Sequence, residues 1–281
     1  MSAEITTTEK IATKPVKIDA IESGLMRFPQ ANCSVTHTFF PGIYVRELHL
    51  KAGTLAIGHY QNFEHANVFI KGKVQMLDDC GKTVGIIEAP MAFKAPPGRK
   101  VGYILEDTVW QNVYSTDITD VEMLEAMLFS KSEQFIQQST TKYFLDYVDN
   151  EKVRTDFKDT VKLLGYTEEK VHEESVNEDD LIPLPFGTYK VKVAISTIDG
   201  LGVIATADID AGERIGIAKA GNKRTPLGRY ANHSSAPNAR MEVDGDIIYL
   251  TSTKFISGTQ GCVAGEEVTV NYEEVIKLVR G

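Results

Sequence analysis

The stretch that most constrains the fold is RYANHSSAPN at residues 229–238. Two other distinctive stretches lie on either side of it along the chain, DGLGVIATADIDAGE at 199–213 and GEEVTVNY at 265–272. All three lie within residues 186–281, where apolar and polar residues alternate as they do in half-buried strands. Glycines break the alternation at turn-like intervals. The pattern therefore predicts a β-rich C-terminal unit closed by a short basic helix.

Taken in order, the three stretches resemble the SET domain of S-adenosylmethionine-dependent protein-lysine methyltransferases, whose motifs read GxG, NHSxxPN and GEExTxxY. The resemblance covers about a third of the chain. It implies a β fold with a knot-like crossing of the chain, S-adenosylmethionine as cofactor and a protein lysine as methyl acceptor. It assigns catalysis to Tyr272, and it assigns cofactor binding to Gly200, Leu201, Gly202, Arg229, Tyr230, Asn232 and His233.

The chemistry of methyl transfer agrees with these assignments. Transfer to an amine is an in-line displacement at an activated carbon, so alignment is the main task of the protein. The hydroxyl of Tyr272 can hold the lysine nitrogen in line. An apolar channel favours the neutral amine by desolvation. Gly200 and Gly202 would let the backbone approach the cofactor without a Cβ in the way.

The sequence also departs from the family pattern. Only residues 217–228 stand where typical members carry an inserted wall of the substrate groove, and only residues 273–281 follow Tyr272. Short SET proteins of bacteria and tailed phages are similar. Two functions stay open: a minimal lysine methyltransferase, or a non-catalytic structural or interaction protein, such as a phage component, that uses its modules as scaffolds.

Residues 41–130 resemble a cupin through HYQNFEHANVFIKG at 59–72 and APPGR at 95–99. Short strands at this spacing predict a β-barrel. The family resemblance implies a divalent metal, for which His59, Gln61 and His65 share the parity of an extended chain and Glu64 is a further candidate. Because Gln61 replaces a family histidine, the sequence favours a barrel with packed, hydrogen-bonded histidines over a metal site.

Between these modules, residues 131–185 show helical periodicity and end in an acidic run, Glu173 to Asp180, followed by two prolines. Gly165 is expected to end one helix and Thr167 to begin the next. The predicted domains are an N-terminal arm at 1–40, the cupin-like barrel at 41–130, a helical connector and linker at 131–185 and the SET domain at 186–281. The predicted fold class is mainly β with some helices.

Composition narrows the functions further. The chain has 281 residues, and 30 Lys and Arg against 39 Asp and Glu give a formal charge of −9, the wrong sign for a nucleic-acid-binding protein. Its three cysteines are isolated, which excludes a disulfide framework. No membrane partner is expected, and we predict a cytoplasmic protein. The switch from acidic to apolar residues near Leu124 and Met127 predicts homo-oligomers formed through the cupin-like domain.

Overall fold

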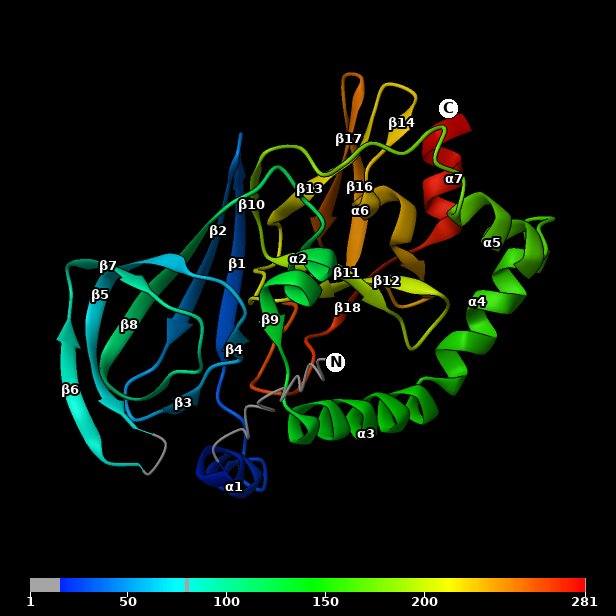
Figure 1. Cartoon of the computed structure of the whole chain (residues 1–281). Coiled ribbons are helices and arrows are strands. Elements are labelled where there is room, and N and C mark those ends of the chain that lie inside the picture. The colour runs from blue at the N-terminus through cyan, green and yellow to red at the C-terminus, as the bar shows by residue number, and fades with distance from the viewer. Residues whose placement is uncertain (1–15, 79–80, 281) are drawn as a thin grey trace, which may run out of the picture.

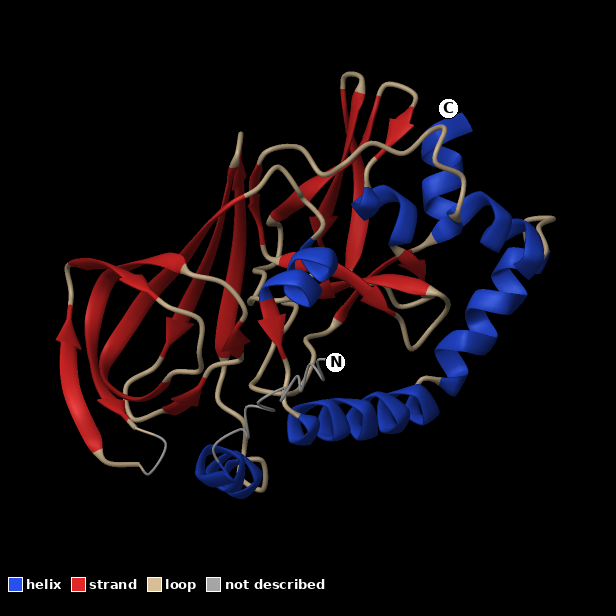
Figure 2. Cartoon of the chain, viewed as in Figure 1, coloured by secondary structure: helices blue, strands red, loops and turns tan. Residues whose placement is uncertain are grey.

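The computed structural model describes residues 16–78 and 81–280. Two β-rich regions lie side by side, and two long helices run along one flank of the second region (Figure 1). Strands dominate both regions and helices lie mostly at the periphery (Figure 2). The fold is mainly β with some helices, as the sequence predicts.

The first region is one large antiparallel sheet. Its strand order is β10-β1-β2-β8-β5-β6, with β3 beside β8 and β7 beside β5. Because this order ends at β6 on one side and at β10 on the other, the sheet is open, and the expected closed barrel is not formed. The strands are β1 (Cys33–Phe40), β2 (Ile43–Leu50), β3 (Leu55–Ile57), β5 (His65–Leu77), β6 (Thr83–Glu88), β7 (Met91–Ala95), β8 (Val101–Ser115) and β10 (Gly187–Tyr189).

Two elements lie in the segment expected to be an N-terminal arm. Helix α1 (Val16–Leu25) is followed by β1, which pairs along its whole length with β2. On β1 the side chains of Val35, His37 and Phe39 are buried while their neighbours are less so, the alternation of a half-buried strand. Strand β10 lies at the start of the predicted SET segment, yet it pairs with β1 and so belongs to the first sheet.

The helical connector begins after β9 (Phe129–Ser130), which pairs with β4 (Tyr60–Gln61). Side-chain caps start the helices: Asp120 accepts from the Met123 amide and Thr167 from the Lys170 amide. Gly165, at φ +82°, ends the helix before Thr167, so the predicted boundary is confirmed. The helices are α2 (Val121–Leu128), α3 (Glu133–Asp149), α4 (Glu151–Leu163) and α5 (Glu168–Ser175).

The second region contains two four-stranded sheets, ordered β11-β12-β18-β15 and β14-β13-β17-β16. All pairings are antiparallel except that of β15 with β18, which is parallel. The elements are β11 (Val191–Ile195), β12 (Leu201–Ala205), β13 (Arg214–Ala220), β14 (Lys223–Arg224), α6 (Pro226–Tyr230), β15 (Asn232–His233), β16 (Ala239–Asp244), β17 (Ile247–Ser252), β18 (Glu267–Val270) and α7 (Tyr272–Arg280).

One hydrophobic core runs through both regions. It joins Phe39 and Tyr44 of the first sheet to Val203 and Val268 of the second, so the two regions pack directly against each other. A smaller cluster around Phe69 and Trp110 fills the concave side of the first sheet. No helix within the described residues is long and apolar enough to cross a membrane.

Candidate functional site

The three sequence motifs meet in one sheet. Strand β12 carries the first motif and pairs with β18, where Val203 faces Val268. Strand β15 carries the second motif and runs parallel to β18, with Asn232 beside Thr269 and His233 beside Val270. Since β18 leads directly into Tyr272, the fold brings all three motif segments into contact.

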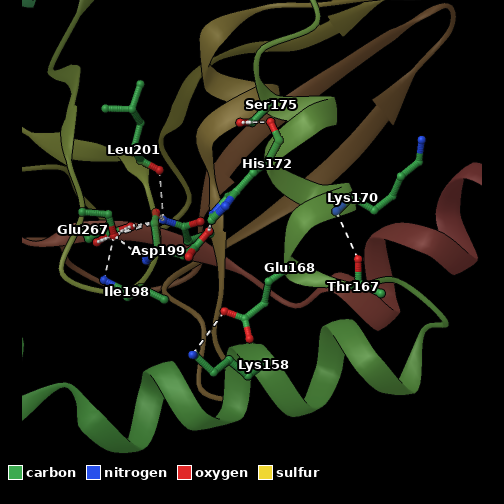
Figure 3. A network of polar contacts seen from close by, with 12 residues as sticks. Lys158, Thr167, Glu168, Lys170, His172, Ser175, Ile198, Asp199, Leu201 and Glu267 are labelled. Atoms are coloured by element: carbon green, nitrogen blue, oxygen red, sulfur yellow. Dashed lines mark hydrogen bonds and ion pairs between the residues drawn. The ribbon is translucent and has the colours of Figure 1, made fainter.

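Asn232 is the centre of a buried polar network. Its Nδ2 lies 3.0 Å from the Asp199 carbonyl, 3.1 Å from the Leu201 carbonyl and 2.8 Å from Glu267 Oε1. Ser196 Oγ donates to the same Glu267 carboxylate. Figure 3 shows Glu267 beside Asp199 and Leu201 in this network. The network ties the first motif to the second and third.

Glu267 is the buried acid of this network. Burial raises the pKa of its carboxyl, while the hydrogen bonds from Asn232 and Ser196 act in the opposite direction. Neither the sequence pattern nor the resemblance assigned it a role beyond its place in the third motif. Its partners lie far apart in sequence, so only the fold identifies the contact.

The two glycines of the first motif have different roles. A Cβ on Gly202 would lie 2.3 Å from Glu267 Oε1 and 3.0 Å from Ser196 Cβ. Packing against Glu267 therefore requires a glycine at position 202. Gly200 has φ +48° and no atom within 4 Å of an added Cβ, so the loop is open at this point.

His233 and Tyr272 form a second contact between motifs. The Tyr272 amide donates to His233 Nδ1 at 3.1 Å, and the two rings lie 5.3 Å apart between centroids. The Tyr272 hydroxyl donates to the Ala231 carbonyl at 3.4 Å, a long bond. Burial raises the pKa of this hydroxyl well above its ordinary value. The hydroxyl is therefore protonated and weakly held.

Helix α4 covers this pair. Thr160 Oγ1 lies 3.1 Å from His233 Nε2, and the Phe157 ring packs edge-on to Tyr272 at 6.1 Å between centroids. Burial lowers the pKa of His233, whereas Asp156, 3.4 Å from Nε2, raises it. The periodicity of residues 131–185 predicted helices here, but local periodicity does not indicate what the buried Phe157 contacts.

Helix α5 reaches the loop of the first motif. His172 Nε2 lies 3.0 Å from an Asp199 carboxylate oxygen, and Lys158 of α4 pairs with Glu168 of α5 at 3.1 Å (Figure 3). His172, whose side chain is 54% exposed, thus joins the connector to the loop at residues 199–201. The two helices together form a wall beside the motif residues.

Arg229 of α6 contacts the acidic segment, Glu173 to Asp180, that was expected to be a linker. Its buried guanidinium donates to the Glu174 carbonyl and to Asp180 Oδ1. Arg224 also pairs with Asp180, at 2.8 Å. The segment therefore packs on α6 through arginine contacts. The side chain of Arg229, assigned to the cofactor by resemblance, is used by this contact, and Tyr230 packs against the shared core.

The three residues proposed as metal ligands do not form one ligand set. His59 and Gln61 line one cavity and His65 another. Gln61 accepts a hydrogen bond from the Tyr114 hydroxyl. Both ring nitrogens of His65 have partners: Nδ1 lies 2.9 Å from the Phe63 carbonyl, and Nε2 lies 3.2 Å from Lys100 Nζ.

His59 packs edge-on against Phe135 at 4.6 Å, and burial lowers its pKa to about 3. Glu64, the further candidate, pairs with Lys94. Within residues 16–78 and 81–280 no group of three His, Cys, Asp or Glu side chains is placed to hold a metal ion.

The predicted oligomer contact is partly internal. Leu124 and Leu128 are buried in the shared core of this chain. Met123 and Met127, on the other face of α2, are 55% and 40% exposed. Of these four side chains of α2, the two methionines are the exposed ones.

Comparison with known proteins gives matches among solved structures alone. No family model matches the chain, and no curated protein matches it. The matching structures are cupin-domain proteins aligned to its N-terminal part. They include a cupin domain from Bordetella pertussis Tohama I, with 12% identity over 32% of this chain and 98% of its own, at a TM-score of 0.27.

Two other cupin structures align over a similar share of this chain. An RmlC-like cupin family protein with a double-stranded β-helix fold from Methanocaldococcus jannaschii has 16% identity over 31% of this chain and 84% of its own, at a TM-score of 0.25. The cupin domain of Schizosaccharomyces pombe Cnp3 has 12% identity over 37% of this chain and 77% of its own, at a TM-score of 0.25.

Proposed function

We propose that the C-terminal region is a minimal S-adenosylmethionine-dependent protein-lysine methyltransferase of the SET type, and that the N-terminal sheet is its accessory and oligomerisation unit. The observation that carries the proposal is the parallel pairing of β15 with β18. This pairing places Asn232 and His233 beside the strand that leads into Tyr272. The motifs that suggest the family are therefore adjacent in space as well as ordered in sequence.

The residues near the first motif suit an extended, charged cofactor. The open loop at Gly200 and the 42% exposed Leu201 leave backbone groups accessible beside the buried Asn232 and His233. S-adenosylmethionine, when bound, supplies an electrophilic methyl group. On this proposal the backbone of residues 199–202 and 229–233 holds it, while the Asn232 side chain fixes the shape of the loop through its bonds to Asp199 and Leu201.

Tyr272 is the proposed catalytic residue. Its hydroxyl has one long hydrogen bond, to Ala231, and so can exchange it for a lysine nitrogen. The raised pKa keeps the hydroxyl protonated at neutral pH, which leaves it one donor and two acceptor positions. Orientation of the amine, and not proton abstraction by a tyrosinate, is therefore its expected contribution.

On this proposal, helices α4 and α5 provide the wall of the substrate groove that residues 217–228 are too few to form. Those twelve residues form part of the β13–β14 hairpin and most of α6, leaving little for a substrate groove. Phe157 instead presents an aromatic ring to Tyr272. We propose that this ring lines the lysine channel, and that a protein substrate approaches beside α4.

The proposal is tested first by titrating S-adenosylmethionine into the whole chain by calorimetry. Binding supports a cofactor pocket. Absence of binding up to millimolar cofactor would contradict the proposal and favour the scaffold function.

Activity is then measured with radiolabelled S-adenosylmethionine and lysine-rich proteins as acceptors. Tyr272→Phe is expected to reduce transfer at least ~10-fold, about the loss of one orienting hydrogen bond in the transition state, with cofactor binding retained. Tyr249→Phe is the matched control. Tyr249 belongs to β17, outside the three motif segments, and its ring lies under the guanidinium of Arg214 from β13. Equal loss in both variants would remove the assigned role of Tyr272.

A further inference from the structure

A row of polar side chains crosses the first sheet on its concave face. Cross-strand pairing places His37 of β1 opposite Arg46 of β2, Arg46 opposite Asn112 of β8 and Asn112 opposite Asn67 of β5. Directly paired residues on neighbouring strands project to the same face. His37, Arg46 and Asn112 line a cavity of about 1150 Å³.

Part of this row lacks hydrogen-bond partners. His37 is fully buried, and its Nδ1 lies 2.7 Å from the Tyr44 hydroxyl, yet its Nε2 has no partner among the described residues. The buried Nε of Arg46 also has none. Buried polar atoms are almost always bonded, so two unpartnered ones on adjacent residues at a cavity indicate a missing group.

Arg46 also makes no direct ion pair among the described residues, although its charge helps to lower the pKa of the Glu125 carboxyl. Two lysines and two glutamates near Arg46 pair with one another: Lys192 with Glu122 at 2.7 Å and with Glu125 at 2.8 Å, and Lys131 with Glu125 at 3.2 Å. Their charges cancel, and Arg46 has no carboxylate within 4 Å in the described part of the chain. Its guanidinium instead lies over the Phe129 ring, 5.2 Å from the centroid.

A second unpaired cation lines the same cavity. Lys100 contacts His65 Nε2 and lies 5.9 Å from the Trp110 ring centroid, with no carboxylate partner among the described residues. Burial lowers its pKa to about 8, as expected for an ammonium removed from water without a counter-charge. Arg46 and Lys100 are therefore two cations of this cavity without an ion-pair partner among the described residues, although several glutamates also line it.

The walls next to Arg46 are apolar. Leu48 and Leu50 follow it at alternate positions of β2, and Ile104 and Trp110 come from β8. A planar guanidinium fork matches a carboxylate in a bidentate manner. Only one fixed cation lies in the polar row, which suits a monoanion better than a doubly charged phosphate.

We propose that this cavity is a binding site for a small organic carboxylate with an apolar body. The carboxylate bonds Arg46 and the Nε2–H of His37, and the apolar body packs against Leu48, Ile104 and Trp110. In this arrangement the Tyr44 hydroxyl donates to Nδ1 of His37, which leaves the ring proton on Nε2. The site goes beyond the proposed methyl transfer, because Arg46 and His37 belong to the first sheet and Tyr272 does not line the cavity, although the cavity also extends to Ser234, Asn238 and Glu267 of the motifs.

The test compares octanoate with 1-octanol, which has the same chain but no charge, by calorimetry on the full-length protein. We expect octanoate to bind at least ~10-fold more tightly, as a charge-assisted hydrogen-bond pair predicts. Arg46→Gln should remove this preference. Arg214→Gln is the matched control, since Arg214 is an exposed arginine paired with Asp244, and should bind octanoate like the wild type.

A second variant separates binding from folding. His37→Phe keeps a ring in the packed position but removes Nε2, and it should weaken octanoate at least ~3-fold with octanol unaffected. Thermal unfolding checks that both variants are folded. Equal affinity for octanoate and octanol, no octanoate binding by the folded wild type, or undiminished octanoate binding by folded Arg46→Gln would each overturn the proposal.

Discussion

The polar network around Asn232 and the polar row of the first sheet differ in how completely their buried groups are hydrogen-bonded. In the C-terminal region, Asn232 meets four acceptors and the carboxylate of Glu267 receives bonds from Ser196 and Asn232. In the N-terminal sheet, His37 and Arg46 carry buried nitrogens with no partner in the described chain. The first network is complete without any added molecule, whereas the polar row of the first sheet is not.

This difference indicates different uses. A fully bonded buried network fixes one arrangement of the chain, because any change leaves a polar group unsatisfied. An incomplete one costs stability and persists where something binds to it. The motif residues of the second region therefore hold a loop in shape, and the row in the first sheet is set up for recognition.

Removal of the central amide should have the largest effect on the complete network. Asn232→Ala removes the side-chain donor that the carbonyls of Asp199 and Leu201 share with the Glu267 carboxylate, although Glu267 keeps its bonds from Ser196. We expect the free energy of unfolding to fall by about 2–4 kcal/mol, measured by urea denaturation. Asn222→Ala, in an exposed turn, should change it by less than about 0.5 kcal/mol. A small effect at Asn232 would mean that the network is not architectural.

A smaller loss is expected from crowding the same network. Gly202→Ala places a methyl group against the Glu267 carboxylate. Hydrogen bonds from Asn232, Ser196 and the Thr197 backbone hold this carboxylate in place. Overpacking of this kind should cost about 1–3 kcal/mol in the same assay. Gly85→Ala is the control, because nothing lies within 4 Å of the added Cβ in β6. If both substitutions are harmless, Glu267 is free to move and the loop is less fixed than described.

The smallest effect concerns pH. The folded pKa of Glu267 is raised above its ordinary value of 4.5, so the unfolded chain loses this proton first as the pH rises. Its contribution to stability is therefore full below pH 4.5 and is lost as the pH rises through the folded pKa. Relative to Glu267→Gln, the wild type should become less stable between acidic and neutral pH.

Glu242 provides the control of opposite sign. Hydrogen bonds from Arg240 and Thr251 lower the pKa of its carboxyl. Its contribution is present above the ordinary value and is lost as the pH falls through the folded pKa. The difference between wild type and Glu242→Gln should therefore shrink toward acid pH. Parallel pH profiles for the two glutamine variants would contradict the assignment of Glu267 as a buried acid.

The sequence predicted much of the C-terminal region and little of the cavity. Motifs around Asn232 and Tyr272 are contiguous, so their strands and their grouping could be inferred from local pattern and resemblance. His37 and Arg46 are nine residues apart in separate strands, and only the β1–β2 register makes them neighbours. The partners of Phe157 and Arg229 likewise depend on long-range packing, which local periodicity does not encode.

The central claim is tested most directly by two matched substitutions of half-buried cations at the same cavity. Lys192 has two carboxylate partners and Arg46 has none among the described residues. In ligand-free buffer, Lys192→Met should lower the free energy of unfolding by about 2–4 kcal/mol, because Glu125 loses one of its two cations. Arg46→Met should cost much less, because Arg46 makes no ion pair among the described residues. An equal loss in both variants would contradict the account and make Arg46 a structural residue.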